Sequence, residues 1–86
     1  MIGRNNPRHS LGVYTMGVVV RLTGIEAHRI RRYEEGGLVQ PSRTNGRQRL
    51  YADHEIQTIR HIAELEDQGI NMPGIKAILE IRRDER

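Results

Sequence analysis

Several residue types are missing from this sequence, and each absence excludes a class of protein. None of the 86 residues is cysteine, so disulfides, thiolate metal sites and cysteine nucleophiles are excluded. Phe and Trp are also missing and only three Tyr are present, so the core must be mainly aliphatic. No apolar run approaches the roughly 18 residues of a membrane span, and no signal-peptide segment is visible, which favours a soluble cytoplasmic protein.

The charge is distributed unevenly along a chain that is long enough for one domain with a modest core. The formal net charge is +3. Residues 1–52 carry nine arginines and three acids, a net charge of +6, whereas residues 53–86 carry −3. One half of the chain can therefore face a polyanion and the other half cannot.

Residues 21–51 hold seven arginines, no lysine and three glutamates. The guanidinium group presents a planar fork of donors that suits phosphates and guanine edges better than the point charge of lysine. This segment predicts double-stranded DNA as the partner.

Three regions are expected: a flexible arm at residues 1–12, a DNA-binding domain at 13–82 and a short tail at 83–86. The arm is polar and has no hydrophobic periodicity. It is either a disordered leader or a segment that contacts DNA through Arg4 and Arg8 or packs on a partner subunit.

Four helices are predicted within the domain. Thr15 is a suitable N-cap for a helix at 16–23, and the turn Gly24-Ile25 leads into a second helix at 26–35. A third helix is expected at 53–68 and a fourth after residue 71. The side chains expected to face the core are Val19, Val20, Leu22, Ala27, Ile30, Tyr33, Ile56, Ile59, Ile62, Ala63, Leu65, Ile75, Ile78, Leu79 and Ile81.

Residues 42–51 are predicted to form a β-hairpin. Asn45-Gly46 at its centre favours a type I′ turn, because both residue types tolerate positive φ angles. Arg43, Arg47 and Arg49 flank the tip. The expected fold is mostly α with this small β-hairpin: a winged helix-turn-helix of four helices plus a wing.

A basic second helix in such a unit would lie in the major groove, and the hairpin would reach the minor groove. By spacing, His28, Arg29 and Arg32 project from one side and are candidates for reading bases. Arg31 and Tyr33 are candidates for positioning phosphates, although Arg31 could instead pair with a neighbouring glutamate. The alternatives are a solvated charged helix face and an edge hairpin that uses charge to avoid pairing with other sheets.

No catalytic constellation is evident, so an enzyme is not expected. Four histidines are present, but their positions have no metal-ligand spacing. No cofactor or metal is predicted.

Five motifs together resemble the MerR winged-helix family. They are MGVV at 16–19, LTGI at 22–25, IRRYEEGGLV at 30–39, PSR at 41–43 and QRLY at 48–51. Residues 69–76 (GINMPGIK) and the wing are most similar to the glutamine synthetase repressor and nitrogen-regulator subgroup, with the heat-shock repressor subgroup second.

The resemblance implies a dimer that binds an inverted repeat. It also implies a role for each matching position. Bases would be read by His28 and Arg29, the backbone gripped by Arg31 and Tyr33, the minor groove entered by Arg47 or Arg49, and a phosphate contacted by Thr15.

Three residues depart from the family pattern. Arg32 replaces the first of two tyrosines, Glu26 replaces the usual small N-cap, and Ala52 replaces the serine that starts the third helix. Larger family members continue into a dimerisation helix and a ligand domain, and nitrogen regulators into a tail that senses glutamine synthetase. Neither follows Arg86, so either the chain is a piece of a longer protein or the arm and fourth helix form the dimer.

The sequence therefore predicts a transcriptional regulator, a repressor that binds an inverted-repeat operator and controls nitrogen (glutamine synthetase) genes. The alternatives are a heat-shock-type repressor, an architectural factor similar to a phage excisionase, and a protein-interaction module exposing its Ile-rich helices.

Overall fold

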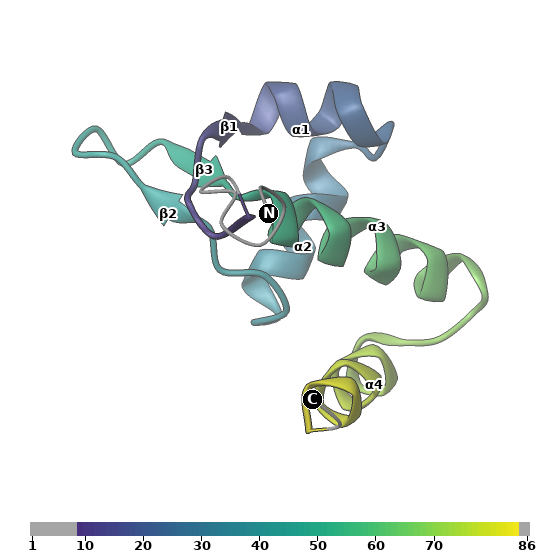
Figure 1. Cartoon of the computed structure of the whole chain (residues 1–86). Coiled ribbons are helices and arrows are strands. Elements are labelled where there is room, and N and C mark those ends of the chain that lie inside the picture. Colours follow the sequence, from purple (N-terminus) through teal and green to yellow (C-terminus); the bar gives the residue numbers. More distant parts are fainter. Residues whose placement is uncertain (1–8, 85–86) are drawn as a thin grey trace, which may run out of the picture.

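Four helices and a small sheet make up the computed structural model, which describes residues 9–84 (Figure 1). The elements are β1 (Tyr14–Thr15), α1 (Met16–Thr23), α2 (Ala27–Glu35), β2 (Ser42–Arg43), β3 (Arg49–Tyr51), α3 (Asp53–Asp67) and α4 (Met72–Asp84). This arrangement confirms the predicted fold class of four helices plus a wing. None of the described helices is long and apolar enough to cross a membrane.

The sheet is antiparallel, with strand order β1-β3-β2. Tyr14 pairs with Tyr51, and Ser42 with Leu50, so the N-terminal strand closes onto the hairpin. Pairing extends one residue further, because the Val13 amide donates to the carbonyl of Tyr51 at 3.0 Å. The wing, defined as residues 42–51, is thereby attached to the start of the domain.

Helix α1 has the predicted bounds. The Thr15 hydroxyl accepts from the amide of Val18, and Gly24 ends the helix with φ of 74°. Val19 is fully buried, but Leu22 is 51% exposed, so its predicted core position is wrong. The face of α1 that meets the core runs through Met16, Val19, Val20 and Thr23, and Leu22 lies beside that face.

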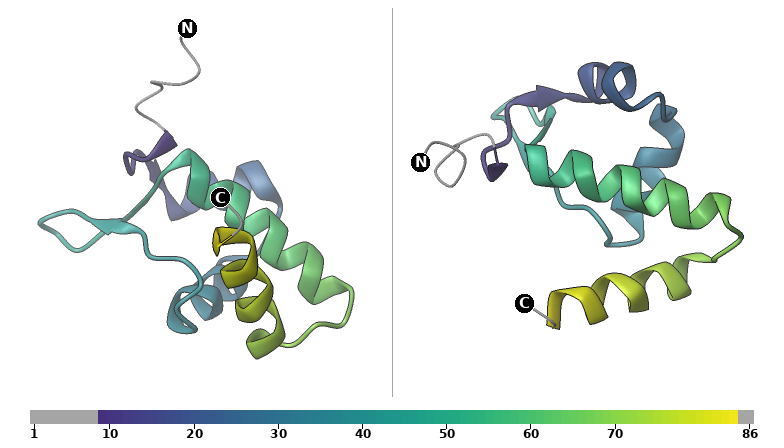
Figure 2. Two further views of the ribbon diagram at one scale, coloured as in Figure 1. Left: turned by 60° about the horizontal axis from the view of Figure 1, so that its bottom comes forward. Right: turned by 45° about the vertical axis from the view of Figure 1, so that its right-hand side comes forward.

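Helix α3 crosses the middle of the molecule (Figure 2). It carries the predicted apolar stripe. Its first turn lacks a capping hydroxyl at Ala52. Instead, Glu55 reaches back and accepts from the Ala52 amide at 2.8 Å. The buried residues of the stripe are Ile56, Ile59, Ile62, Ala63 and Leu65.

Helix α4 lies at the edge of the molecule, apart from the sheet (Figures 1 and 2). Asn71 caps it through a 3.0 Å bond from the Gly74 amide, as predicted. Ile75 is fully buried, whereas Ile81 is 58% exposed, which corrects its predicted core position. The helix packs through its first turns and continues to Asp84, two residues past the predicted domain end.

The predicted arm falls largely outside the described residues, including Arg4 and Arg8. Within the described part, Gly12 lies against β3: a Cβ on this residue would come 2.7 Å from the Leu50 carbonyl oxygen. The chain is therefore already packed on the domain at Gly12.

Candidate nucleic-acid interface

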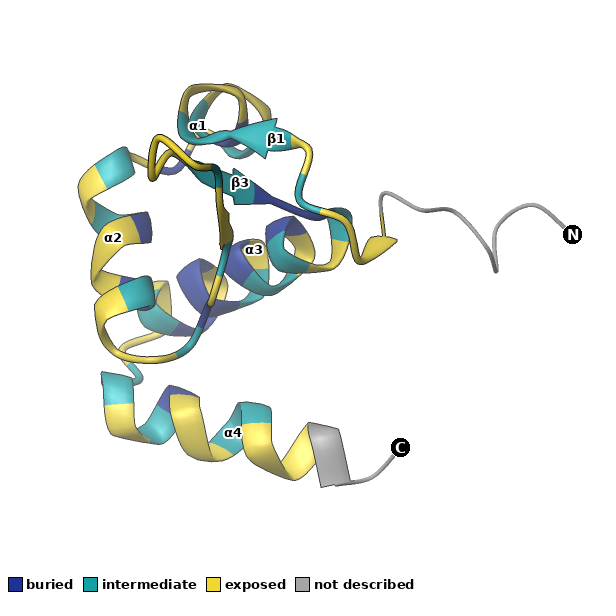
Figure 3. Cartoon of the chain, turned by 90° about the vertical axis from the view of Figure 1, so that its left-hand side faces the viewer, coloured by how far each residue is buried: buried dark blue, intermediate teal, exposed yellow. Residues whose placement is uncertain are grey.

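Helix α2 lies between the wing and the C-terminal end of α3. Its Ile30 and Tyr33 side chains are fully buried and fix which face of the helix points to the core. At 3.6 residues per turn, Arg29 and Arg32 then project toward α3, and Glu34 projects toward the wing. Figure 3 shows the remaining arc of α2 exposed on the outer face of the molecule.

The start of α2 presents His28 to solvent. The turn before the helix is one residue longer than predicted, and Glu26 serves as N-cap without a side-chain capping bond. The Glu26 carboxylate instead lies 3.7 Å from His28 Nδ1, and the His28 side chain is 65% exposed. His28 is thus available on the outer arc, with a carboxylate beside it.

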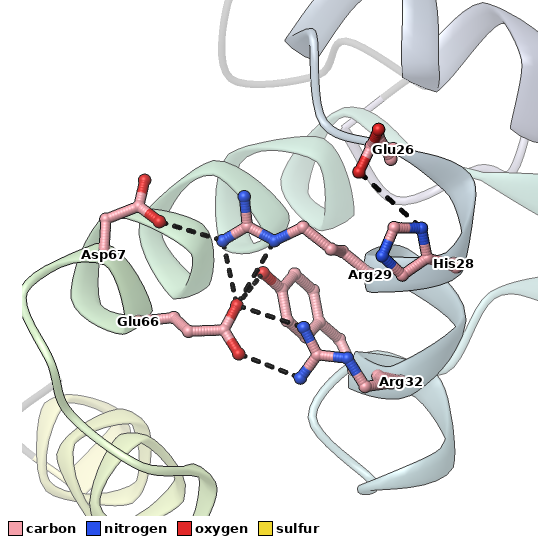
Figure 4. A network of polar contacts seen from close by, with 7 residues as sticks. Glu26, His28, Arg29, Arg32, Glu66 and Asp67 are labelled. Atoms are coloured by element: carbon pink, nitrogen blue, oxygen red, sulfur yellow. Dashed lines mark hydrogen bonds and ion pairs between the residues drawn. The ribbon is translucent and has the colours of Figure 1, made fainter.

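A cluster around Glu66 joins α2 to α3 (Figure 4). Glu66 accepts from Arg29 Nη2 at 2.8 Å, from Arg32 Nη1 at 2.8 Å and from the Tyr33 hydroxyl at 2.8 Å. Arg29 Nη2 also donates to Asp67 at 3.1 Å. Both arginines are therefore paired within the protein.

Glu66 is held strongly in its ionised form. Hydrogen bonds from Arg32, Arg29 and Tyr33 lower its pKa to about 2, against partial burial, which acts the other way. The same carboxylate raises the pKa of Arg29 and of Arg32. Burial, followed by the bond to Glu66, raises the pKa of Tyr33 to about 12. All four groups keep their charge states at neutral pH.

A second carboxylate, Glu34, ties the wing to α2. It accepts from Arg43 Nη2 and from Arg49 Nε, each at 2.5 Å. The Glu34 side chain is 16% exposed, so these pairs are partly shielded from water. One carboxylate from α2 thus contacts both strands of the hairpin.

The wing tip is not the predicted type I′ turn. Neither Asn45 nor Gly46 has a positive φ, whereas Arg47 has φ of 68°. The Arg47 amide donates to the Thr44 carbonyl at 2.8 Å, and the Thr44 hydroxyl accepts from the Gln48 amide at 3.1 Å. These bonds describe a turn followed by one left-handed residue, a common hairpin connection in which that residue is usually glycine.

Three of the seven arginines remain unpaired in the described part of the chain. Arg21, Arg31 and Arg47 are exposed and form no ion pair with any residue from 9 to 84. The predicted alternative that Arg31 pairs with Glu34 or Glu35 is therefore wrong: Arg43 and Arg49 pair with Glu34, and Arg31 forms no ion pair with Glu35.

Tyr33 differs from the role that the family resemblance implied. Its side chain is fully buried and its hydroxyl is bonded to Glu66, so it does not lie on the surface that could meet a phosphate. The helical spacing of the sequence had predicted this inward position. Thr15 is partly exposed, and its hydroxyl is engaged as the cap of α1.

Sequence reasoning missed Glu66 and Asp67. Both lie more than 30 residues from the arginines they contact, and no local pattern links them. Among residues 9–84, no three His, Asp or Glu side chains are placed to hold a metal ion. The charged side chains that form contacts at this surface are thus arginines and carboxylates.

Comparison with known proteins identifies the family. Residues 14–81 match the family described as MerR HTH family regulatory proteins. The chain belongs to the MerR family. This is a family of helix-turn-helix regulatory proteins.

Curated MerR-family relatives resemble the chain over most of its length. The HTH-type transcriptional regulator GlnR of Bacillus anthracis is 40% identical over 78 residues, which cover 91% of this chain and 60% of that protein. The putative heat shock protein HspR of Streptomyces coelicolor is 41% identical over 70 residues, covering 80% of this chain and 46% of that protein. The chain thus spans about half to three fifths of these relatives.

Solved structures show the same fold. HiNmlR, a MerR family regulator lacking the sensor domain and bound to promoter DNA, superposes with a TM-score of 0.77 at 24% identity. The match covers 85% of this chain and 56% of that one. The transcription regulator PbrR691 from Ralstonia metallidurans, in complex with lead(II), superposes with a TM-score of 0.76 at 23% identity. That match covers 86% of this chain and 59% of the other. These identities support the architecture alone.

Proposed function

We propose that the chain binds an inverted-repeat operator as a homodimer and represses transcription. Helix α2 would enter the major groove and the wing the minor groove beside it. The observation that carries this proposal is the exposed outer arc of α2, with an arginine-tipped wing held against the same helix by Glu34. A two-fold dimer would place its two α2 helices about one helical turn of DNA apart.

Within this interface, His28 and Arg31 are the proposed major-groove contacts of α2. Both are exposed, and Arg31 has no ion pair within residues 9–84. Arg47 is the proposed minor-groove residue, because it stands exposed at the wing tip. Arg43 and Arg49 also lie on the wing, although both form ion pairs with Glu34. Thr15, at the start of α1, is partly exposed and is a further proposed contact.

Nitrogen-responsive genes are the proposed targets. The 40% identity with GlnR regulators over 91% of the chain supports this, together with the resemblance of residues 69–76 to the nitrogen-regulator subgroup. A heat-shock-type operator is the second candidate, since HspR is 41% identical over a shorter stretch.

Selection of bound sequences from a random duplex pool tests this proposal. An enriched, two-fold symmetric motif is expected, and its sequence decides between the nitrogen and heat-shock operators. Enrichment of an asymmetric motif, or of none, would contradict a dimeric operator-binding protein. Binding should also weaken steeply with salt, because arginine–phosphate contacts release counterions.

A further inference from the structure

The Glu66 carboxylate uses the same donors that a DNA phosphate would use. It accepts from Nε and Nη2 of Arg29 and from Nη1 and Nη2 of Arg32, four guanidinium contacts between 2.8 and 3.4 Å. Arg29 is further engaged by Asp67, and its side chain is only 23% exposed. The carboxylate therefore satisfies the donor forks of two arginines on the DNA-facing helix.

The cluster is electrically neutral, because two arginines face two acids. Arg31, the residue between them on α2, has no such partner within residues 9–84 and keeps its charge uncompensated. Three neighbouring arginines of one helix thus differ in what they offer to a polyanion. In the described part of the chain, Arg31 keeps all its side-chain donors free of ion pairs, whereas Arg29 and Arg32 each have some of their donors engaged by carboxylates.

Glu66 itself is anchored. Its Oε1 atom accepts from the hydroxyl of Tyr33, whose ring is fully buried in the core. Arg32 also lies over that ring, with its guanidinium carbon 5.8 Å from the ring centre. The Glu66 carboxylate is thus bonded to the core as well as to the two arginines.

We propose that Glu66, supported by Asp67, sets the sequence discrimination of this protein by withholding Arg29 and Arg32 from nonspecific phosphate contacts. This inference rests on the proposed function. Random DNA would then be contacted by fewer arginine side chains than the number of arginines in the sequence suggests. Operator DNA would be recognised by the residues that remain free, chiefly His28, Arg31 and the wing.

The direct test compares E66Q with E35Q on a random-sequence duplex and on the selected operator over a salt series. Glu35 is exposed on α2 and has no ion pair within residues 9–84, so its replacement removes the same charge without releasing an arginine. E66Q should bind the random duplex several-fold more tightly, with a salt slope steeper by up to about 2 for two added phosphate contacts. Its operator affinity should change less, so the ratio of the two affinities should fall.

A change in E66Q no larger than in E35Q would overturn the proposal, and so would an unchanged salt slope on random DNA. If E66Q does not fold, R31Q and R32Q decide the matter in the otherwise unchanged chain. R31Q should reduce the salt slope of binding to the random duplex by about 1, whereas R32Q should leave that slope nearly unchanged. Equal losses in both variants would overturn the proposal.

The unaltered protein separates this inference from the proposed function. If it enriches no symmetric sequence, the operator-binding proposal fails whatever the variants do. If it binds a symmetric operator but E66Q and E35Q behave alike, the operator-binding proposal stands and only the role of Glu66 is wrong.

Discussion

The buried hydroxyl of Tyr33 donates a 2.8 Å hydrogen bond to Glu66 across the junction of α2 and α3. The same carboxylate accepts from Arg29 and Arg32, so one acid bonds to three side chains of α2. Glu34 of α2 accepts in turn from two arginines of the wing. Two carboxylates therefore connect α2 to α3 on one side and to the wing on the other.

Replacing Glu66 by glutamine should destabilise the protein by about 3 kcal/mol at pH 7, because a pKa of about 2 in the folded state stabilises the ionised form. This contribution is present above the ordinary glutamate pKa near 4.5 and is lost as the pH falls toward 2. Urea unfolding of both proteins from pH 7 to pH 3 checks it. A stability difference that stays constant over this range would contradict the ion-pair account.

Replacing Tyr33 by phenylalanine should cost about 1.5–3 kcal/mol, the usual range for a hydrogen bond to a charged group. Tyr51 provides the matched control, since it is equally buried but its hydroxyl lies 3.9 Å from the weakly accepting sulfur of Met16. Y51F should therefore cost clearly less in thermal or urea unfolding. Equal costs would mean that the bond to Glu66 adds nothing beyond burial of the ring.

Arg47 should be unfavourable for stability and favourable for binding. Its φ of 68° costs a residue with a Cβ atom roughly 1–2 kcal/mol, which glycine avoids at some cost in chain entropy. R47G should thus be more stable than R47A in urea unfolding, while both lose the same affinity for the operator. If R47A proves the more stable variant, the left-handed conformation at the wing tip is not what the structure indicates.

Glu34 should matter for operator affinity although it is an acid facing DNA. E34Q frees the wing from α2, so the operator should be bound several-fold more weakly, with random DNA little affected. E35Q, at the next and exposed position, should bind both duplexes slightly better because it only removes a negative charge. Tighter operator binding by E34Q would show that the ion pairs do not position the wing.

Local signals in the sequence predicted the framework of the domain. Thr15 and Gly24 define α1 through contacts within a few residues, and the apolar stripe of α3 is visible from its spacing. The wing was predicted as a hairpin, but its turn type was wrong. Thr44 bonds with its carbonyl and hydroxyl to residues three and four positions on, and this network places the left-handed conformation at Arg47 rather than at Asn45-Gly46.

Which arginines form ion pairs and which stay unpaired could not be predicted from the sequence, because the pairing depends on tertiary contacts. Arg29 and Glu66 are 37 positions apart, and several other acids of α3 were equally plausible partners from the sequence. Tyr33 illustrates the reverse case: helical spacing predicted its burial, and the family resemblance implied a surface role. Exposure at Leu22 and Ile81 was missed because each lies on a helix with only a narrow or partial packing surface.

Footprinting of the protein on its selected duplex by hydroxyl radicals tests the central claim most directly. Binding of a dimer through α2 and the wing predicts two symmetric protected half-sites on one face of the DNA, about one helical turn apart, and their loss in R31Q. Protection that spreads along the duplex without symmetry, as expected for an architectural factor, would contradict the account.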